Sequence, residues 1–340
     1  MKILKHKKIL IFGGSGSLGM ALINRFVEDN VLHIFSRDEA KHWSIKNKVN
    51  NDNLTFSVGD IRDKGRVSEV LRKQNADIVI IASALKQVDI CEAAPFESIQ
   101  TNILGIVNII DSINIQENVL TNLKSVLMIS TDKACAPVNV YGMCKAIAER
   151  IVTSNTLTNS NVNFIGVRYG NVLESRGSIL PLFRHQADNS DSFTLTDSSM
   201  TRFLMTLNDS IDLIVEAICN AKSGEIWLPK IKSMRINDLA EIFSTKYNKP
   251  IKVIGIRPGE KLHEDLISES ESLRVKDIGT HYILGKIDSS IIKNPQLFSY
   301  TSNDEVMNKL QLKEYLDELG ILDWELSKFQ GKSIDEIRMD

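Results

Sequence analysis

The sequence has few cysteines, no excess of either charge and no long apolar run. Its four cysteines among 340 residues lack the spacing of metal sites or disulfide frameworks. Basic residues number 41 and acidic residues 43, so no basic excess indicates a nucleic-acid partner. No segment approaches the roughly 20 apolar residues of a membrane-spanning helix, and the first apolar run is too short for a signal peptide. We therefore expect a cytoplasmic protein without a metal, a nucleic-acid partner or a membrane association.

Short apolar segments of strand length alternate with segments of helical spacing over about the first half of the chain. Hydrophobic residues make up 43% of the sequence, and a chain of this length can bury a large core in two lobes. We expect strands at 8–12, 31–36, 54–58, 76–82, 125–130 and 163–168, and one helix from 95 to 117. Such alternation predicts an α/β fold with a Rossmann-type, doubly wound parallel sheet.

The alternation ends near Val172, and the remaining pattern predicts a smaller α/β lobe. Here we expect helices at 208–221 and 310–322, a helix that starts near 233, and strands at 225–228 and 251–256. We assign residues 1–172 and 203–228 to the Rossmann domain, which binds the cofactor. Residues 173–202 and 229–340 then form the substrate-binding domain.

A glycine-rich segment follows the first predicted strand and opens the first helix. Gly13, Gly16 and Gly19 give the pattern G-x-x-G-x-x-G. Glycines at this spacing allow a tight turn, close approach to a pyrophosphate and close packing of the helix on the strand. The loop predicts a dinucleotide site formed by Gly13, Ser15, Gly16, Ser17 and Leu18. The alternative is a glycine-rich turn without a ligand.

The end of the second predicted strand indicates which dinucleotide binds. A site that prefers NAD usually has an acidic residue there, which binds the ribose hydroxyls. This chain instead has Ser36 and Arg37, with Lys41 nearby, and these residues suit a 2′-phosphate. We therefore predict NADP, the alternative being that Arg37 is a solvated surface charge.

Further cofactor contacts are predicted after the third and fourth strands. The candidates are Asp60, Ile61, Ala82, Ala84 and Lys86. Ala82 and Ala84, after the fourth strand, are small and let the backbone pass close to a cofactor. Asp60 has the alternative of capping the next helix, and Lys86 that of a solvated lysine.

The strongest chemical signal is a tyrosine and lysine pair that follows a buried strand. Tyr141 and Lys145 are four residues apart and point to one face of a predicted helix. A phenol has a reference pKa of about 10, and a neighbouring ammonium favours its phenolate. The strand before this helix ends in Thr131, Asp132 and Lys133, at the edge where open α/β sheets place their ligands.

These motifs together resemble a known superfamily. The glycine pattern, Ser36-Arg-Asp-Glu39, Ser130-Thr-Asp-Lys133 and Tyr141-x-x-x-Lys145 are similar to those of extended short-chain dehydrogenases/reductases. Further segments resemble the inverting UDP-N-acetylglucosamine 4,6-dehydratases of the polysaccharide biosynthesis protein family. They are Arg168-Tyr-Gly-Asn-Val172, Ser175-Arg-Gly-Ser178, Met200-Thr-Arg-Phe203 and Arg257-Pro-Gly-Glu-Lys261. The resemblance covers about residues 6 to 285, and Glu174 departs from it because a small residue is usual there.

The resemblance implies a role for each catalytic candidate. Tyr141 takes the proton of the C4 hydroxyl while NADP oxidises C4, and Lys145 holds the nicotinamide ribose and lowers the tyrosine pKa. Lys133 resembles the base that removes the C5 proton, and Asp132 the acid that protonates the departing C6 hydroxyl. The product is then a C5-inverted UDP-4-keto-6-deoxy-N-acetyl-L-hexosamine. The alternative for Asp132 and Lys133 is a mutual salt bridge at a strand end.

The resemblance also implies a UDP-N-acetylglucosamine site, or a site for a close UDP-sugar, in a homo-oligomer between a dimer and a hexamer. Arg257 and Glu260 would hold the UDP, and Asn171 would contact both substrate and cofactor. The full set of expected substrate contacts is Lys86, Thr131, Tyr141, Asn171, Ser175, Arg202, Arg257 and Glu260.

Two other functions compete with the dehydratase. A nucleotide-sugar 4-epimerase shares the fold, the cofactor and the Tyr141/Lys145 pair, but it has no use for an acid and a base at C5 and C6. Asp132 and Lys133 therefore favour the dehydratase. A non-catalytic NADP-binding sensor would not need these four side chains, although fold alone never proves activity.

Overall fold

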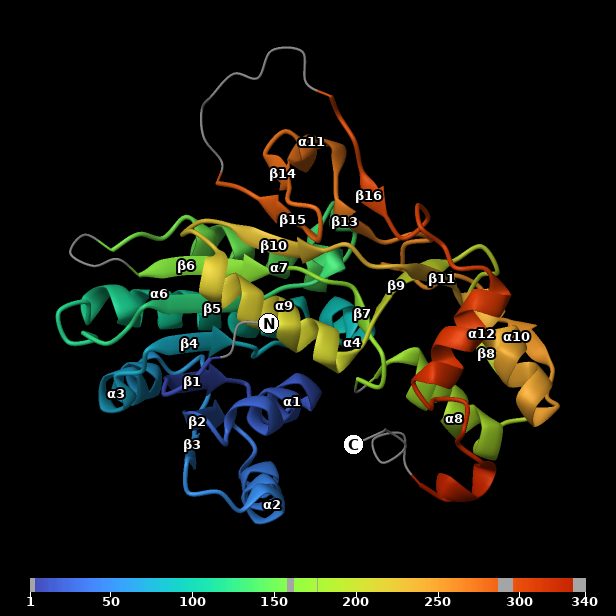
Figure 1. The fold of residues 1–340 in the computed structure, drawn as a ribbon, viewed down its shortest axis with the longest axis horizontal. Helices are drawn as coiled ribbons and strands as arrows, with labels where there is room; N and C mark the ends of the chain where they lie inside the picture. The colour runs from blue at the N-terminus through green and yellow to red at the C-terminus, as the bar shows by residue number, and fades with distance from the viewer. Residues whose placement is uncertain (1–3, 158–161, 176, 287–295, 333–340) are drawn as a thin grey trace.

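The structure, a computed structural model, describes residues 4–157, 162–175, 177–286 and 296–332 (Figure 1). Within these residues the central sheet has the strand order β14-β15-β10-β6-β5-β4-β1-β2-β3. Its parallel strands are β1 (Lys8–Phe12), β2 (Val31–Ser36), β3 (Leu54–Val58), β4 (Ile78–Ile81), β5 (Ser125–Ile129), β6 (Asn163–Val167) and β10 (Ile226–Pro229). The order 3-2-1-4-5-6 of the first six strands confirms the predicted Rossmann-type fold.

Helices cover both faces of this sheet, which is why its central strands are apolar along their whole length. In β1, Ile9, Leu10, Ile11 and Phe12 are all fully buried. One face packs against α1 (Ser17–Phe26), α2 (Glu39–Val49) and α9 (Leu207–Asn220). The other face packs against α3 (Lys64–Gln74), α6 (Gly105–Ile115) and α7 (Val140–Thr153) (Figure 1). No helix in the described ranges combines the length and apolarity that crossing a membrane requires.

The prediction of one continuous helix from 95 to 117 is wrong, because the helix is interrupted. The segment consists of α5 (Pro95–Ile99), a π-helical turn η1 (Gln100–Leu104) and α6. The buried Asn102 accounts for the interruption, because its side-chain amide bonds the backbone N and O of Leu85 at 2.9 and 2.8 Å. These bonds fasten the turn to the loop after β4, and π-helical turns of this kind are frequent at functional sites.

A second lobe lies beside the carboxyl edge of the sheet (Figure 1). Its core consists of phenylalanine, leucine and methionine side chains, among them Phe183, Phe193 and Phe243. They come from α8 (Ile179–Asn189), β8 (Phe193–Leu195), α10 (Ile236–Tyr247) and α12 (Lys309–Glu318), and β12 (Ile251–Val253) pairs with β8. Strand β12 ends three residues before the predicted limit of 256, and the segment after it is exposed.

Smaller elements connect the two lobes. Strands β7 (Asn171–Val172), β9 (Thr201–Met205) and β11 (Ser233–Arg235) form one small sheet, and β13 (Asp265–Ile267) pairs with β16 (Tyr300–Thr301). Strands β15 (His281–Leu284) and β14 (Val275–Asp277) continue the main sheet beyond β10 in the antiparallel direction. The predicted division assigned these two strands to the substrate-binding domain, and in the structure they extend the Rossmann sheet.

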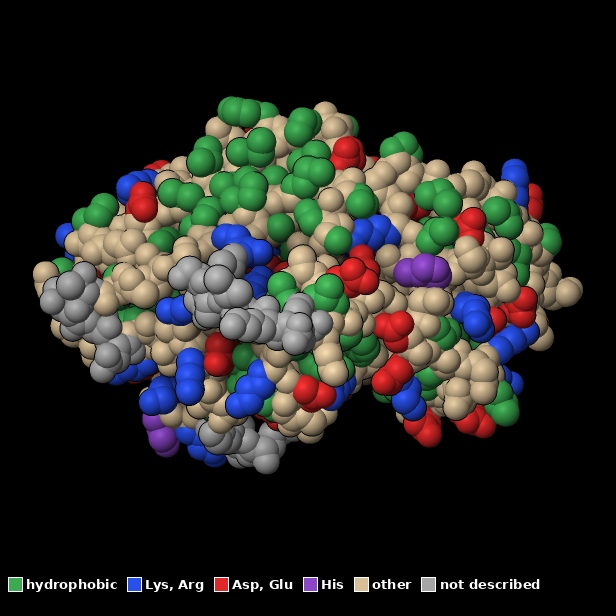
Figure 2. Space-filling view, turned by 90° about the horizontal axis from the view of Figure 1, so that it is seen from above, with side chains coloured by type: hydrophobic (Ala, Val, Ile, Leu, Met, Phe, Trp, Pro, Cys, Tyr) green, Lys and Arg blue, Asp and Glu red, His purple; other side chains and the backbone are tan. Residues whose placement is uncertain are grey.

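Hydrophobic side chains gather on part of the surface seen in Figure 2. Exposed apolar side chains on α5, η1 and α7 include Phe96, Leu104, Met143 and Ile147. Exposed apolar patches often mark protein–protein interfaces. The homo-oligomer expected from the resemblance stays a prediction.

Candidate active site

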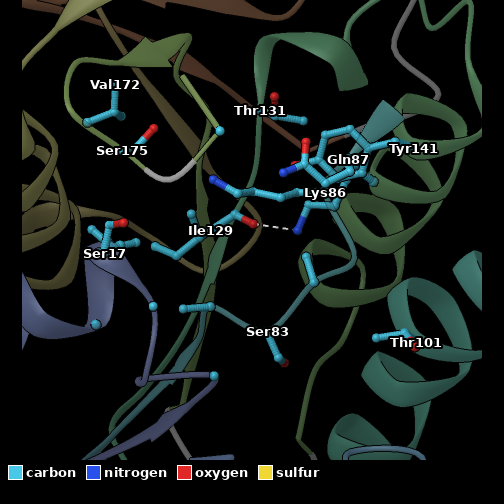
Figure 3. Close-up of a pocket in the computed structure, with 18 of the residues that line it drawn as sticks. Ser17, Ser83, Lys86, Gln87, Thr101, Ile129, Thr131, Tyr141, Val172 and Ser175 are labelled. Atoms are coloured by element: carbon cyan, nitrogen blue, oxygen red, sulfur yellow. Dashed lines mark hydrogen bonds between the residues drawn. The ribbon is translucent and has the colours of Figure 1, made fainter. Parts of the chain in front are cut away.

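A cavity of about 690 Å³ lies at the carboxyl ends of β1, β2, β4 and β5 (Figure 3). This edge includes the point between β1 and β4 where the strand order reverses, which is where open α/β sheets bind ligands. All predicted cofactor-binding residues line the cavity, as do the four predicted catalytic residues. The predicted substrate residues line it too, with the exception of Arg202.

The glycine-rich loop has room for a ligand. Gly13 has φ 85°, and a Cβ there would lie 2.5 Å from the backbone of Ser83, while a Cβ at Gly19 would lie 2.0 Å from the Gly14 carbonyl oxygen. At Gly16, by contrast, a Cβ would meet no described atom within 4 Å, although this residue lines the cavity. Gly16 is also the N-cap of α1, and no described side chain caps this helix. The uncapped N–H groups of α1 therefore suit the pyrophosphate of a dinucleotide.

Asp38, two residues after the end of β2, is held in a helix cap. The carboxylate of Asp38 accepts the backbone N–H of Lys41 at 3.0 Å and lies 2.6 Å from the Lys41 ammonium. These two bonds lower the pKa of Asp38 and occupy its oxygens. The guanidinium of Arg37 is more than half exposed and lies 3.6 Å from Asp60. A positive charge, rather than a free carboxylate, thus faces the part of the cavity where an adenosine ribose is expected.

Two details of this region differ from the sequence expectations. The Ser36 hydroxyl lies 2.6 Å from Nε2 of His42, a residue that sequence reasoning did not select. Burial lowers the pKa of His42, which favours the neutral ring as its partner. The alternative role of Asp60 as a helix cap is wrong, because Asp63 caps α3 and Asp60 binds Arg62 instead.

Tyr141 and Lys145 lie in the first two turns of α7, whose N-cap Asn139 accepts the N–H of Gly142 at 2.8 Å. The Lys145 ammonium donates to the Ile129 carbonyl at 2.6 Å, the dashed line in Figure 3. Burial lowers the pKa of Lys145 to about 8. Burial also raises the pKa of Tyr141 to about 12, and the positive charge that opposes this shift belongs to Lys133.

Asp132 and Lys133 follow β5 in the short 3-10 turn η2 (Asp132–Ala134). The Lys133 ammonium lies 3.1 Å from Oδ1 of Asp132, so the salt bridge considered from the sequence is present. A second carboxylate, Glu264, lies 3.1 Å from the same ammonium and was not selected from the sequence. Burial raises the pKa of Asp132, and the negative charge of Glu264 adds to this shift. Asp132 therefore lies in surroundings that favour its protonated form.

Arg202 does not reach the cavity wall. It lies on β9, where its guanidinium donates to the carbonyls of Thr201 and Leu262 at 2.7 and 3.2 Å and lies 3.7 Å from Glu264. The side chain is largely buried by these partners. The structure thus does not bring Arg202 to the cavity, and its guanidinium lies beside Glu264 instead.

The departure at Glu174 has a structural explanation. Glu174 adopts a positive φ of 61°, and its carboxylate binds the fully buried guanidinium of Arg184 at 2.7 Å. Arg184 in turn stacks on Trp324, 4.2 Å from the ring centre. Glu174 does not line the cavity, whereas its neighbour Ser175 does. The glutamate thus anchors the loop to the second lobe instead of filling the cavity.

The loop that carries Arg257 and Glu260 is tied to the start of α7. The Asn139 side chain donates to the Gly259 carbonyl at 2.8 Å, and Lys261 donates to the Cys135 carbonyl at 2.9 Å. Both bonds hold the loop over η2. They explain how residues more than 100 positions apart in the sequence share one cavity.

Several cavity residues escaped sequence reasoning because no motif marks them. They include Ser83, Gln87, Val88, Asp89, Thr101, Tyr169 and Leu207. Among the described residues, some buried oxygens of the lining have no hydrogen-bond partner, namely those of Ser83, Thr101, Ser130, Ser178, Asn171 Oδ1 and Asp132 Oδ2. Buried polar atoms are normally satisfied. A bound polar ligand or water would supply the missing partners.

The model of the polysaccharide biosynthesis protein family matches residues 9–286. The chain belongs to this family. One relative is an uncharacterized membrane protein of Methanocaldococcus jannaschii, 36% identical over 94% of this chain and 97% of that protein. Another is a UDP-glucose 4-epimerase of Rickettsia prowazekii, 36% identical over 94% of this chain and 96% of that enzyme.

Solved structures share the fold of this polysaccharide biosynthesis protein. Pen from Bacillus thuringiensis has a TM-score of 0.86 and 34% identity, and the match covers 94% of this chain and 99% of Pen. A dTDP-glucose 4,6-dehydratase from Streptomyces venezuelae, solved with NAD bound, has a TM-score of 0.66. That match covers 75% of this chain and 86% of the dehydratase at 17% identity, so it shows the fold alone.

Proposed function

We propose that this protein is an NADP-dependent, C5-inverting UDP-N-acetylglucosamine 4,6-dehydratase, a hydro-lyase. The observation that carries the proposal is the pair of Asp132 and Lys133 in the same cavity as Tyr141. An acid and a base beside the alcohol-oxidising tyrosine are what an elimination of water next to a new ketone requires. An enzyme that only oxidises C4 needs neither.

The nucleotide-binding part of the cavity suits NADP. Gly16 and the N-terminus of α1 would hold its pyrophosphate, and Arg37 and Lys41 its 2′-phosphate. Lys145 would hold the nicotinamide ribose. When bound, NADP supplies a two-electron oxidation at C4 of the sugar and the matching reduction at C6.

The side chains divide the proton transfers among them. Tyr141 takes the proton of the C4 hydroxyl during oxidation, and the resulting ketone acidifies the C5 hydrogen. Transfer of the Lys133 ammonium proton to Asp132, 3.1 Å away, gives both the neutral amine and the protonated acid. Lys133 then takes the C5 proton, and Asp132 gives its proton to the C6 oxygen, which leaves as water. Burial favours the protonated Asp132 that this step needs. The product after reduction at C6 and reprotonation of C5 is a UDP-4-keto-6-deoxy-N-acetyl-L-hexosamine.

The remaining polar residues suit a UDP-sugar. Arg257 and Glu260, held against α7, would bind the diphosphate and ribose of UDP. Lys86, Thr131, Asn171 and Ser175 line the same cavity as Tyr141 and would surround the sugar. Figure 3 shows Lys86, Thr131 and Ser175 on separate segments around this cavity.

A nucleotide-sugar 4-epimerase is the second candidate. The Rickettsia prowazekii relative is named UDP-glucose 4-epimerase, and Tyr141 with Lys145 would be sufficient for oxidation and reduction at C4. The ion pair between Lys133 and Asp132 would then serve the fold alone.

Incubation with UDP-N-acetylglucosamine in heavy water, followed by NMR of the early product, separates the two candidates. The dehydratase gives a C6 methyl group and a deuterium at C5 in the L-configuration, because Lys133 exchanges its proton with solvent. The epimerase gives UDP-N-acetylgalactosamine without deuterium on carbon. A D-configured 6-deoxy product would contradict C5 inversion alone, and the absence of any turnover of UDP-N-acetylglucosamine would contradict the proposed dehydratase.

A further inference from the structure

Glu264 is a buried carboxylate next to the proposed base. It directly precedes β13 and is 2% exposed. Its Oε1 lies 3.1 Å from the Lys133 ammonium and 3.7 Å from Nε of Arg202, while its Oε2 is buried without a hydrogen-bond partner among the described residues. Glu264 does not line the cavity, whereas Lys133 does. Glu264 can therefore act on a bound sugar only through neighbouring side chains, and Lys133 is a neighbour that it contacts in the cavity wall.

Lys133 and its charged neighbours include two carboxylates and a second cation. In the ion-paired state before any proton moves from Lys133 to Asp132, the two anions are Asp132 and Glu264, and the two cations are Lys133 and Arg202. The Lys133 ammonium is paired with two carboxylates, so the loss of one of them removes half of the negative charge next to it. The charge of Lys133 also opposes the rise in the pKa of Tyr141, and the charge of Lys261 helps to lower the pKa of Glu264.

We infer that Glu264 is a positioning residue for Lys133: it fixes the ammonium beside Asp132 and sets the pH at which the amine can accept a proton. In its catalytic part this inference rests on the proposed dehydratase, in which Lys133 takes the C5 proton. The charges agree with it. Burial alone would lower the pKa of Lys133, but Asp132 and Glu264 raise it above its usual range. Burial would raise the pKa of Glu264, but Lys133 and Arg202 lower it.

The inference can be tested without turnover. Lys133 lines the cavity, so its reaction with acetic anhydride can be followed by mass spectrometry as a function of pH, and only the neutral amine reacts. In Glu264→Gln the labelling curve should move to lower pH, with about tenfold or more labelling at a fixed pH below the midpoint, since an opposite charge at this distance shifts a pKa by about one unit or more. Glu264→Asp, which restores the charge, should return the curve toward that of the wild type.

Two further variants keep the test decisive. Arg202→Gln should move the Lys133 curve to higher pH, because it removes the competing cation from Glu264. Glu271→Gln is the matched control: it is also a buried, ion-paired carboxylate, bound to Arg168 at 2.8 Å, and should leave the midpoint unchanged. Superimposed curves for the wild type and Glu264→Gln would overturn the inference. If Glu264→Gln does not fold, an unchanged curve in Arg202→Gln would overturn it equally.

The pH profile of turnover separates this inference from the proposed function. If the protein is the dehydratase, the alkaline rise in elimination rate should move to lower pH in Glu264→Gln together with the labelling curve. A shifted labelling curve in a protein that does not dehydrate UDP-N-acetylglucosamine would overturn the proposed function and leave the positioning role supported. A turnover profile that stays fixed while labelling shifts would overturn the catalytic part of the inference.

Discussion

Lys145 shows how one buried residue can be kept for function at a cost to stability. Its side chain is almost fully buried on α7, and the ammonium has a single described acceptor, the Ile129 carbonyl. Burial lowers its pKa from 10.5 to about 8. The folded state therefore disfavours the charged lysine relative to the unfolded chain. A shift of this size corresponds to roughly 3 kcal/mol at neutral pH.

Lys145→Met should consequently raise the free energy of unfolding by about 2 kcal/mol at pH 7, after allowance for roughly 1 kcal/mol from the lost hydrogen bond. The gain should be complete below pH 8, where both folded and unfolded lysine are protonated. It should shrink between pH 8 and 10.5, where only the unfolded lysine keeps its proton.

Urea unfolding between pH 7 and pH 9.5 measures this dependence. Lys64→Met serves as the control, because that lysine is about half exposed and should change stability by less than about 0.5 kcal/mol. A destabilised Lys145→Met, or a gain that grows with pH, would contradict the explanation. Loss of turnover in the same variant would show that function retains the lysine.

At the scale of elements, local patterns explain the strands well and the irregular segments poorly. The first three strands coincide with the predicted ranges, because a run of apolar side chains between polar loops is itself the signal of a buried parallel strand. The π-helical turn at 100–104 could not be predicted, since it depends on bonds from Asn102 to the distant Leu85. Strand β15 depends likewise on pairing with β10, and β14 on pairing with β15.

The glycine-rich loop gives a matched pair of substitutions. Gly13→Ala should destabilise the fold by roughly 1–3 kcal/mol, because φ is 85° and a Cβ would lie 2.5 Å from the Ser83 backbone. Gly16→Ala should leave the fold stable but weaken NADP binding, because its Cβ projects into open space in the cavity. Thermal unfolding and calorimetric titration with NADP measure the two effects. Equal destabilisation by both variants, or normal NADP binding by Gly16→Ala, would contradict the assignment of this loop.

At the scale of the whole molecule, contacts between distant segments complete the site. The catalytic candidates were predictable because Tyr141 and Lys145 share a helix face and Asp132 and Lys133 follow a strand. Glu264 was not predictable, because no local pattern brings it to Lys133 across more than 130 residues. The same holds for the bond from Asn139 to Gly259 that places the Arg257 loop. Sequence motifs thus indicate candidate reacting groups, while tertiary contacts determine their charge and position.

The central claim is that one cavity oxidises C4, eliminates water across C5 and C6, and then reduces C6. UDP-N-acetylglucosamine carrying deuterium at C4 tests it most directly, in ordinary water and with NMR of the early product. We predict that the deuterium moves from C4 to the new C6 methyl group. Tyr141, Lys133 and Asp132 would complete the elimination before the deuteride removed from C4 is transferred to C6. Deuterium that remains at C4 of an epimerised sugar would contradict the account.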